Sequence, residues 1–344
     1  MRVALSLLVF ITACGGNPGD GAPADGAIGT IDGAPAPPDA APPRRVRFIA
    51  VGDAGKGNAA QYAVAEAMRG VCAERGCDFV ILLGDNIYEA GVDSTVDSQW
   101  QTKFEQPYAD LDLPFYAALG NHDYGGRLLT LDLPGIGNEW VRGVTEVEYS
   151  QVSSKWTMPA THYTFAMDHV GFIVLDTNSI IWDDTTHGDQ AAWLPTAFAE
   201  LEGRDWVFLV GHHPYRSNGT HGNAGDYDAP ELAGVTLPNP LPIQDGEHVK
   251  DFFDAHLCGV ADVYFAGQHH SRAFIARRAG AAPSFGSVGR RRVDHRSRIA
   301  ATSCLRGRQR ARFFYVDADG DTFTGAFYDR AGHLDFTRTF QRAP

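Results

Sequence analysis

The chain has 344 residues, enough for one large domain or two ordinary ones, and its 44% hydrophobic and 21% charged residues are the usual balance of a globular protein. Its formal net charge of −13 argues against broad binding to nucleic acid or to anionic lipid, because an anionic surface repels polyanions. We therefore expect no nucleic-acid partner. A phosphorylated substrate is still compatible with this charge, since a bound metal ion can invert the local field.

The first 13 residues have the features of an export signal. A short basic start precedes an apolar run from Val3 to Thr12, which is too short to span a bilayer. The run ends in Ile-Thr-Ala-Cys, which resembles a bacterial lipobox with Cys14 as the lipid-carrying residue. We expect an exported cell-envelope lipoprotein, at the periplasmic face or the outer membrane, that contacts the membrane only through its lipid anchor. The alternative is a plain secretory signal with an incidental cysteine.

A tether follows this signal. Residues 15–44 are almost entirely glycine, alanine, proline and aspartate, with no periodicity and little to bury. The lipidated cysteine and this stretch, residues 14–44, should therefore form a disordered linker. From Arg45 the composition becomes globular, and we expect residues 45–344 to form one domain.

Four cysteines remain if Cys14 carries the lipid. An even number in an oxidising compartment permits two disulfides. Cys72 and Cys77 are close enough in the sequence to close a small loop at the end of a helix, and Cys258 would then pair with Cys304. Three pairings are open to four cysteines, so this arrangement is only the preferred one.

The globular part predicts alternating strands and helices. An apolar strand at 46–51 is followed by a helix that Asn58 can cap and that runs to about Arg75, and its buried stripe should contain Tyr62, Ala65, Met68 and Cys72. Later elements are strands at 79–83, 115–119, 163–167, 172–176, 206–210 and 263–266, helices at 189–201 (distorted at Pro195) and 244–256, and antiparallel strands at 312–316, 323–328 and 334–340.

Several of these strands end in a glycine that is followed at once by a residue able to bind a metal ion. They are Gly52-Asp53, Gly84-Asp85, Gly120-Asn121, Gly211-His212 and Gly267-Gln268-His269-His270. Ligands bind at the carboxyl ends of strands in α/β sheets, and glycine permits a sharp turn there. We therefore expect an α/β fold with two mixed β-sheets in a sandwich, flanked by helices, and one site at one edge.

The chemistry of this set indicates a metal centre. An aspartate after a strand is more often a turn residue or a helix cap than a ligand, so each motif is weak when taken singly. Together, in this order and at strand ends, they are poorly explained by chance. Anionic oxygens mixed with imidazoles suit Fe, Mn or Zn better than Ca or Mg.

The motifs around Asp53, Asp85, Asn121-His122-Asp123 and His212-His213 resemble those of the calcineurin-like metallophosphoesterase family, and more narrowly those of purple acid phosphatases of the small, tartrate-resistant type. The general family often has a histidine two residues after the first aspartate. Here Gly55 takes that place, and Tyr88 follows the second aspartate by three residues, which is the purple-phosphatase variant. The resemblance covers about Val46 to Arg272, and it implies the family's αββα fold.

The resemblance implies a centre of two metal ions whose ligands are Asp53, Asp85 as the bridge, Tyr88, Asn121, His212 and His270. A phenolate and carboxylates favour Fe(III) in the first site, with divalent Fe, Zn or Mn in the second. The implied activity is hydrolysis of phosphate monoesters by a water molecule that the metals activate. The substrate would be a phosphorylated small molecule or a phosphoprotein.

The resemblance also assigns roles around the metals. His122 would donate a proton to the leaving-group oxygen, and Asp123 would orient its ring. His213 and Tyr215 would line the pocket, although packing or loop anchoring is an equal alternative for both. Arg216 would hold a phosphate oxygen, unless it is a solvated surface residue.

The last motif departs from the family pattern, which is usually Gly-His-x-His. Gln268 stands where a histidine ligand of the second metal is expected, and an amide oxygen binds a late divalent ion more weakly than imidazole. His269 is an alternative ligand, although neighbouring side chains in an extended segment point opposite ways. The stretch from Arg272 to Arg312 is unusually rich in arginine, which indicates either a basic patch that gathers anionic substrates or a locally altered coding sequence.

Three functional readings follow from these observations. The leading one is a phosphomonoesterase. The motifs are also compatible with a phosphodiesterase or nucleotidase, because metal ligands do not fix the leaving group. The third is a non-catalytic envelope lipoprotein without a firm second metal, which Gln268 favours and the pair His122 and Asp123 opposes. The sequence leaves the oligomeric state open.

Overall fold

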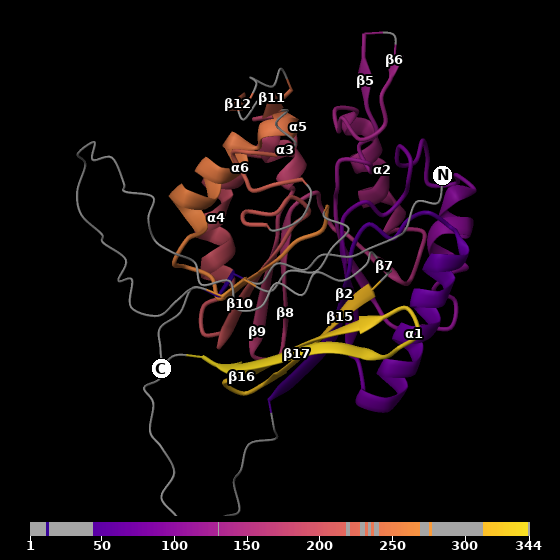
Figure 1. Ribbon diagram of the computed structural model, residues 1–344, viewed down its shortest axis with the longest axis vertical. Coiled ribbons are helices and arrows are strands. Elements are labelled where there is room, and N and C mark those ends of the chain that lie inside the picture. The colour runs from indigo at the N-terminus through magenta and orange to yellow at the C-terminus, as the bar shows by residue number, and fades with distance from the viewer. Residues whose placement is uncertain are drawn as a thin grey trace, which may run out of the picture.

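Figure 1 shows a computed structural model of the chain, and the residues that it describes are 12–13, 44–129, 131–217, 221–227, 231–232, 235–236, 241–268, 275–276 and 312–342. Cys14, most of the expected tether, His269, His270, Cys304 and nearly all of the arginine-rich stretch lie outside these residues. The expectations that concern them stay predictions.

Two mixed sheets form the centre of the molecule, as the sequence predicted. The larger has the order β17-β16-β15-β2-β3-β4-β7 and the smaller the order β13-β10-β9-β8. The strands of the larger sheet are β2 (Arg45–Val51), β3 (Phe79–Leu83), β4 (Phe115–Ala118), β7 (Trp156–Thr157), β15 (Arg312–Asp319), β16 (Thr322–Asp329) and β17 (Leu334–Gln341). Those of the smaller are β8 (Tyr163–Met167), β9 (Val170–Val174), β10 (Trp206–Val210) and β13 (Val263–Phe265).

Strand direction explains why the site lies at one edge. β2, β3, β4 and β7 are mutually parallel, and so are β9, β10 and β13. The carboxyl ends of parallel strands meet on one side of a sheet, so the loops that follow them gather there. β15 to β17 extend the larger sheet in antiparallel fashion on the far side of β2.

The two sheets pack through a buried layer of phenylalanines. Phe48 of β2 lies 5.5 Å from Phe172 of β9 and 5.6 Å from Phe265 of β13, measured between ring centroids. Phe79 of β3 lies 5.5 Å from Phe172, again edge to face. Such ring pairs add packing specificity to the burial of large apolar surfaces. This core fixes the sheets against each other and so holds the ligand-bearing loops in register.

Helices cover the outer faces of both sheets, as Figure 1 shows. α1 (Ala59–Arg75) and α2 (Trp140–Tyr149) lie on the side of the larger sheet, and the π-helical turn η1 (Gln101–Glu105) precedes β4 in the chain. α4 (Gln190–Glu200) and α6 (Glu247–Phe252) lie on the side of the smaller sheet, with α3 (Thr177–Ile181) and α5 (Pro242–Asp245) near the top of the view, and the π-helical η2 (Phe253–Leu257) continues α6. Short paired segments complete the fold: β1 (Thr12–Ala13) with β14 (Ile275–Ala276), β5 (Arg127–Leu128) with β6 (Leu131–Asp132), and β11 (Glu231–Leu232) with β12 (Val235–Thr236). None of the described helices is both long and apolar enough to cross a membrane.

The first helix agrees with the sequence prediction at its start but not along its buried face. Asn58 caps α1 as expected, because its side chain accepts hydrogen bonds from the backbone N–H groups of Ala60 and Gln61. The expected stripe is displaced, however, since Tyr62 is 40% exposed. The buried face consists of Gln61, Val64, Ala65, Ala67, Met68 and Val71. The predicted helix at 244–256 is three short pieces, whereas α4 continues through Pro195.

A disulfide closes the end of α1. Cys72 and Cys77 are bonded, with their Cα atoms 5.0 Å apart. Gly76, between them, donates its N–H to the carbonyl of Cys72, which ends the helix. Cys258 is exposed, and its expected partner lies outside the described residues.

Candidate metal centre

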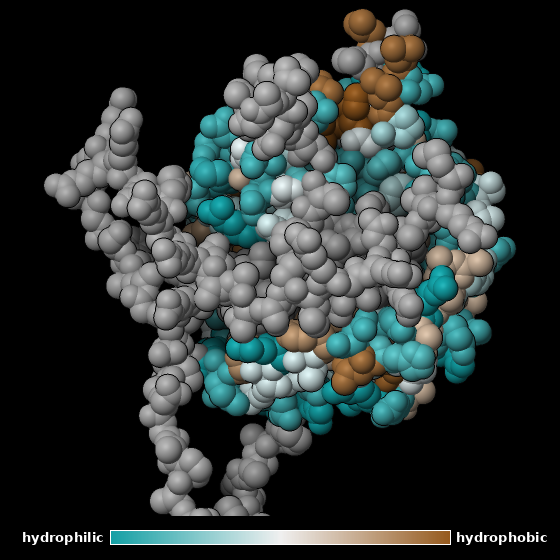
Figure 2. Space-filling model, viewed as in Figure 1, coloured by the Kyte–Doolittle hydropathy of each residue, from teal (hydrophilic) through white to brown (hydrophobic). Residues whose placement is uncertain are grey.

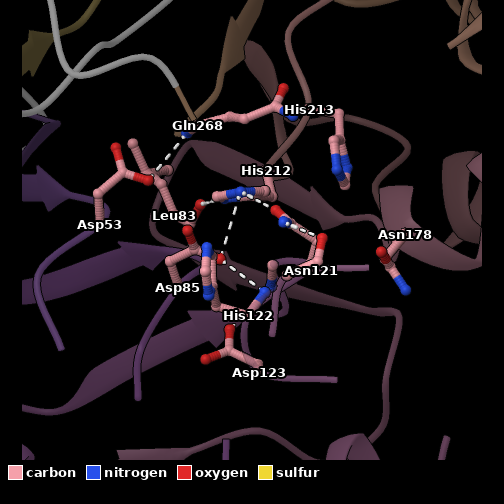
Figure 3. A network of polar contacts seen from close by, with 12 residues as sticks. Asp53, Leu83, Asp85, Asn121, His122, Asp123, Asn178, His212, His213 and Gln268 are labelled. Atoms are coloured by element: carbon pink, nitrogen blue, oxygen red, sulfur yellow. Dashed lines mark hydrogen bonds and ion pairs between the residues drawn. The ribbon is translucent and has the colours of Figure 1, made fainter. Parts of the chain in front are cut away.

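Three of the expected ligands meet at the carboxyl edge of the sheets. One ligand atom from each of Asp53, Asp85 and His212 lies within 4.8 Å of the other two, and all three residues are buried (Figure 3). They come from the loops after β2, β3 and β10. This convergence is the arrangement that the strand-glycine-ligand pattern predicted.

The local backbone explains the choice of residues at these turns. Asp53 and Asp85 have φ values of 54° and 56°, in the left-handed region that aspartate tolerates better than most residues. Gly120 lies against Asp85 and His212: a Cβ atom there would lie 2.4 Å from Asp85 Oδ1 and 3.0 Å from His212 Cε1. The glycine is therefore required by the close approach of two ligand side chains.

His212, Asn121 and Asp85 direct three atoms with lone pairs toward one another. His212 Nε2 lies 3.0 Å from Asn121 Oδ1 and 3.4 Å from Asp85 Oδ1. The carbonyl of Leu83 accepts from His212 Nδ1–H at 2.9 Å, so in the neutral ring Nε2 carries the lone pair. Asn121 donates its amide N–H to the carbonyl of Gly135 at 2.7 Å, which turns its oxygen toward the histidine. These three lone-pair atoms would repel one another without a positive charge between them. Their arrangement therefore fits a bound cation.

Further unsatisfied oxygens point to the same conclusion. Among the described residues, Asp53 Oδ2 and Gln268 Oε1 are buried without a hydrogen-bond partner. The backbone N–H of Gln268 donates to Asp53 Oδ1 at 3.1 Å, which places the glutamine beside the first aspartate. Buried polar atoms are nearly always paired in folded proteins. These unpaired oxygens therefore fit a metal centre to which Gln268 also belongs.

Tyr88 lies against the expected bridging residue. Its hydroxyl donates to Asp85 Oδ2 at 2.6 Å, and its ring is buried beneath Lys56, whose Nζ lies 4.0 Å from the ring centroid. Burial raises the pKa of Tyr88 well above its usual range, and the charges of Asp85 and Asp53 raise it further. A cation at this position would reverse the effect of those charges.

The two aspartates experience different surroundings. Burial raises the pKa of Asp53 to about 7, with His212 opposing and Asp85 reinforcing the shift. Burial also acts to raise the pKa of Asp85, but the nearby His212 and His122 and the hydrogen bond from Tyr88 outweigh it and lower the value to about 2. Asp85 is thus the more firmly anionic member of the pair, as a bridging ligand should be.

Asp123 does not orient the ring of His122, contrary to expectation. His122 Nδ1 instead donates to the backbone carbonyl of Glu89 at 2.7 Å. Asp123 is buried and accepts from the backbone N–H groups of Asn86, Ile87 and Gly120 at 2.6, 3.0 and 2.8 Å. Its carboxylate therefore ties the loop after β4 to the loop after β3, and burial raises its pKa to about 8.

The side chains after His212 serve packing more than the cavity. His213 is buried, with Nδ1 2.9 Å from the hydroxyl of Thr177. Tyr215 stacks on Phe253 at 5.3 Å and hydrogen-bonds to Asp254, while the guanidinium of Arg216 lies 5.1 Å from the Tyr215 ring. None of the three lines the cavity beside the metal ligands. For His213 and Tyr215 the structure favours the packing and loop-anchoring alternatives.

That cavity has a volume of about 450 Å³ and opens to the surface beside the metal ligands. It is lined by Asp85, Tyr88, Asn121, His122, Leu133, Pro134, Gly135, Ile136, His221, Leu241, Ile243, Gln244 and Gln268. The volume lies in the ordinary range for small-molecule sites. The side chain of His122 reaches this space, where a substrate could meet its free ring nitrogen.

Comparison with known proteins agrees with this geometry. The family model described as "Calcineurin-like phosphoesterase" matches residues 46–259. The chain belongs to this family. It is 28% identical over 243 residues to tartrate-resistant acid phosphatase type 5 of Oryctolagus cuniculus, covering 62% of this chain and 66% of that protein. It is 28% identical over 223 residues to purple acid phosphatase 4 of Arabidopsis thaliana, covering 61% of each.

These relatives confirm that this calcineurin-like phosphoesterase is of the purple acid phosphatase type. The chain spans a little under two thirds of the length of the relatives named above. Among solved structures, "GAP50 the anchor in the inner membrane complex of Plasmodium" superposes with a TM-score of 0.53 at 15% identity, covering 87% of this chain and 90% of that chain. That likeness concerns the fold alone.

Sequence reasoning missed one cluster that supports the ligands of this phosphoesterase. Asp176, Thr177 and Asn178, at the start of α3, are buried behind His212 and His213. The Thr177 hydroxyl oxygen accepts from the backbone N–H groups of both histidines, at 3.2 and 3.0 Å. With both lone pairs used, its own hydrogen is left for His213 Nδ1.

The neighbours of Thr177 reach the other site loops. Asp176 Oδ2 accepts from the hydroxyl of Tyr124 at 2.5 Å, and Tyr124 directly follows the Gly-Asn-His-Asp motif. Asn178 donates to the carbonyl of Gly137 at 2.7 Å, at the end of the segment that lines the cavity. The α3 start thus joins three loops. Asp176 caps α3, and the sequence could have shown this role. Unlike the predicted ligands, however, Asp176 does not follow a glycine at the end of its strand.

Proposed function

We propose that this protein hydrolyses phosphate monoesters with a centre of two metal ions. The observation that supports this most is the convergence of three lone-pair atoms: Asn121 Oδ1 and Asp85 Oδ1 lie 3.0 and 3.4 Å from His212 Nε2. The relatives named as acid phosphatases favour the same chemistry. The substrate would be a phosphorylated small molecule or a phosphoprotein.

The ligands divide into two sets around the expected bridge, Asp85. Asp53 and Tyr88 would hold the first ion together with His270, and the phenol and carboxylates of this set suit Fe(III). Asn121 and His212 would hold a divalent Fe, Zn or Mn ion, with Gln268 at the remaining side. When bound, such a pair of ions neutralises the phosphoryl oxygens and makes a water molecule acidic enough to serve as the nucleophile.

The chain's own groups would complete the reaction. The protonated ring of His122, held at Nδ1 by the carbonyl of Glu89, can give its Nε2 proton to the departing alcohol. Asn121 keeps its oxygen turned inward because its amide N–H is bonded to Gly135. Asp123 holds the loop that carries both residues against the loop after β3.

A metal analysis combined with an aryl phosphate assay tests this proposal. The purified protein should contain close to two metal ions per chain and should hydrolyse 4-nitrophenyl phosphate, and His122→Ala should lower turnover while metal content is retained. A protein that holds two metals but cleaves no phosphate ester would contradict the proposal. A protein that lacks a firm second metal and cleaves no phosphate ester would instead favour the second candidate, a non-catalytic envelope lipoprotein, which the replacement of a histidine by Gln268 supports.

A further inference from the structure

The cavity beside the metal ligands is polar at one end and apolar along its walls. Its polar end consists of Asp85, Tyr88, Asn121, His122 and Gln268. One wall is formed by Leu133, Pro134 and Ile136, and the rest of the lining contains Leu241 and Ile243 together with the polar His221 and Gln244. A phosphate at the polar end would therefore direct its ester group along these apolar side chains.

The first wall is rigidly attached to the metal centre. Leu133 and Gly135 donate their N–H groups to the carbonyls of Gly126 and Gly125, at 2.9 and 3.2 Å. The indole N–H of Trp182 donates to the carbonyl of Ile136 at 3.1 Å. Asn121, an expected ligand, is bonded to Gly135 in the same segment. The backbone of this wall is thus held in place relative to Asn121.

This wall continues into an exposed leucine surface on the hairpin of β5 and β6. Leu133, Leu131 and Leu129 are 37%, 63% and 91% exposed. Figure 2 shows apolar residues gathered over this hairpin, at the top of the view. The two charged residues on the hairpin, Arg127 and Asp132, form a salt bridge of 3.0 Å with each other. Leu133 also lines the cavity, and exposed apolar side chains that gather in one place indicate a binding surface.

The charge of the lining also restricts the ester group. Among the described residues, the cavity lining has no lysine or arginine, and its cationic candidates are His122 and His221. A leaving group that carries further phosphates or carboxylates normally meets lysine or arginine in its site. The described walls offer none, and the whole chain carries a net charge of −13.

We propose, on the basis of the phosphomonoesterase function above, that the site selects esters of uncharged, apolar alcohols. The alcohol lies along the apolar side chains of the lining, Leu133, Ile136, Leu241 and Ile243. Polyanionic esters such as nucleoside polyphosphates are poor substrates, because their charge meets apolar walls. Leu133, which directly follows β6, is therefore a specificity residue of the enzyme.

A homologous series of alkyl phosphates tests the proposal. From ethyl to hexyl phosphate the acidity of the leaving alcohol is almost constant, so a change in kcat/KM reports contact with the walls. We expect a rise of up to about fourfold for each methylene that becomes buried. The 5-carboxypentyl phosphate, which has a charged end in place of the terminal methyl group, should be a poorer substrate than hexyl phosphate. A flat series, or equal rates for these two esters, would overturn the proposal.

Variants locate the effect on the wall. Leu133→Ser should reduce kcat/KM for hexyl phosphate by about tenfold relative to ethyl phosphate, and Leu133→Met should retain the preference. Leu334→Ser is the matched control, since Leu334 is 54% exposed on β17, outside the cavity. An equal loss in the control and in Leu133→Ser would refute the assignment to the wall.

Binding of alkylphosphonates separates this inference from the proposed activity. These compounds are not hydrolysed, and calorimetry of the metal-loaded protein with ethyl, butyl and hexyl phosphonate measures contact with the walls directly. Affinity that rises with chain length supports the inference even if no ester is cleaved, in which case the proposed activity alone fails. Affinity independent of chain length overturns the inference, even if every ester is hydrolysed.

Discussion

Replacement of Thr177 by valine should weaken both the fold and the metal centre. Valine has nearly the same shape as threonine but lacks the oxygen that accepts from the backbone N–H groups of His212 and His213. Both histidines are fully buried, so water cannot replace the lost acceptor. An unsatisfied buried donor costs about 1–3 kcal/mol, which gives about 2–6 kcal/mol for two. Thr177→Ser keeps the oxygen and serves as the control.

The loss should divide between stability and metal binding. Urea unfolding in the presence of a chelator measures the first part, and competition with a chromophoric chelator measures the second. Because His212 is positioned through its backbone, we expect divalent-ion affinity to fall by about 10- to 100-fold in Thr177→Val. The serine variant should stay close to the wild-type protein in both measurements. If the valine and serine variants are indistinguishable, the Thr177 hydroxyl does not hold the loop of His212.

Four further changes test the remaining assignments. Asp85→Asn should lower metal affinity and turnover by more than about a hundredfold, because outer-shell changes alone cost about 10- to 100-fold, and wild-type metal affinity would refute a bridging role. Tyr88→Phe should abolish the visible colour of an Fe(III) preparation, and a coloured variant would place the chromophore elsewhere. Cys14→Ser should release the protein from membrane pellets or block its processing, whereas unchanged membrane association would disprove the anchor. Gln268→His should lower the Mn²⁺ or Zn²⁺ concentration needed for activity by about tenfold or more, since imidazole is the better donor, and an unchanged metal requirement would count against a weakened second site.

The sequence predicted the ligands better than their supports. Asp53, Asp85 and His212 could be found because each follows a strand and a glycine, and that periodic signal is local. The supporting contacts are not local. Thr177 is 35 residues from His212, and Asp123 is 37 residues from Asn86. A pattern along the chain cannot show which loops the fold brings together.

The role of Asp123 was a second source of error. The family resemblance implied that Asp123 would orient the ring of His122. The loop conformation instead directs Asp123 toward the backbone of Asn86 and Gly120, and His122 toward the carbonyl of Glu89. The buried stripe of α1 also differs from the prediction. The polar Gln61 is buried, whereas the neighbouring aromatic residue, Tyr62, is exposed. Burial of Gln61 is possible because its amide donates to the carbonyl of Lys103 and accepts from Gly57.

The hydrogen bonds of the expected ligands would link metal binding to the proposed recognition of the substrate. Asn121 is bonded to Gly135, and Gly135 belongs to the apolar wall that ends at Ile136. Asn178, beside Thr177, is bonded to Gly137 directly after that wall. One set of contacts therefore holds His212, Asn121 and the wall, so a shift of the wall would also turn the amide oxygen of Asn121. For this reason changes at Thr177 should alter both divalent-ion affinity and the dependence of kcat/KM on alkyl chain length, whereas Leu133→Ser should alter only the second.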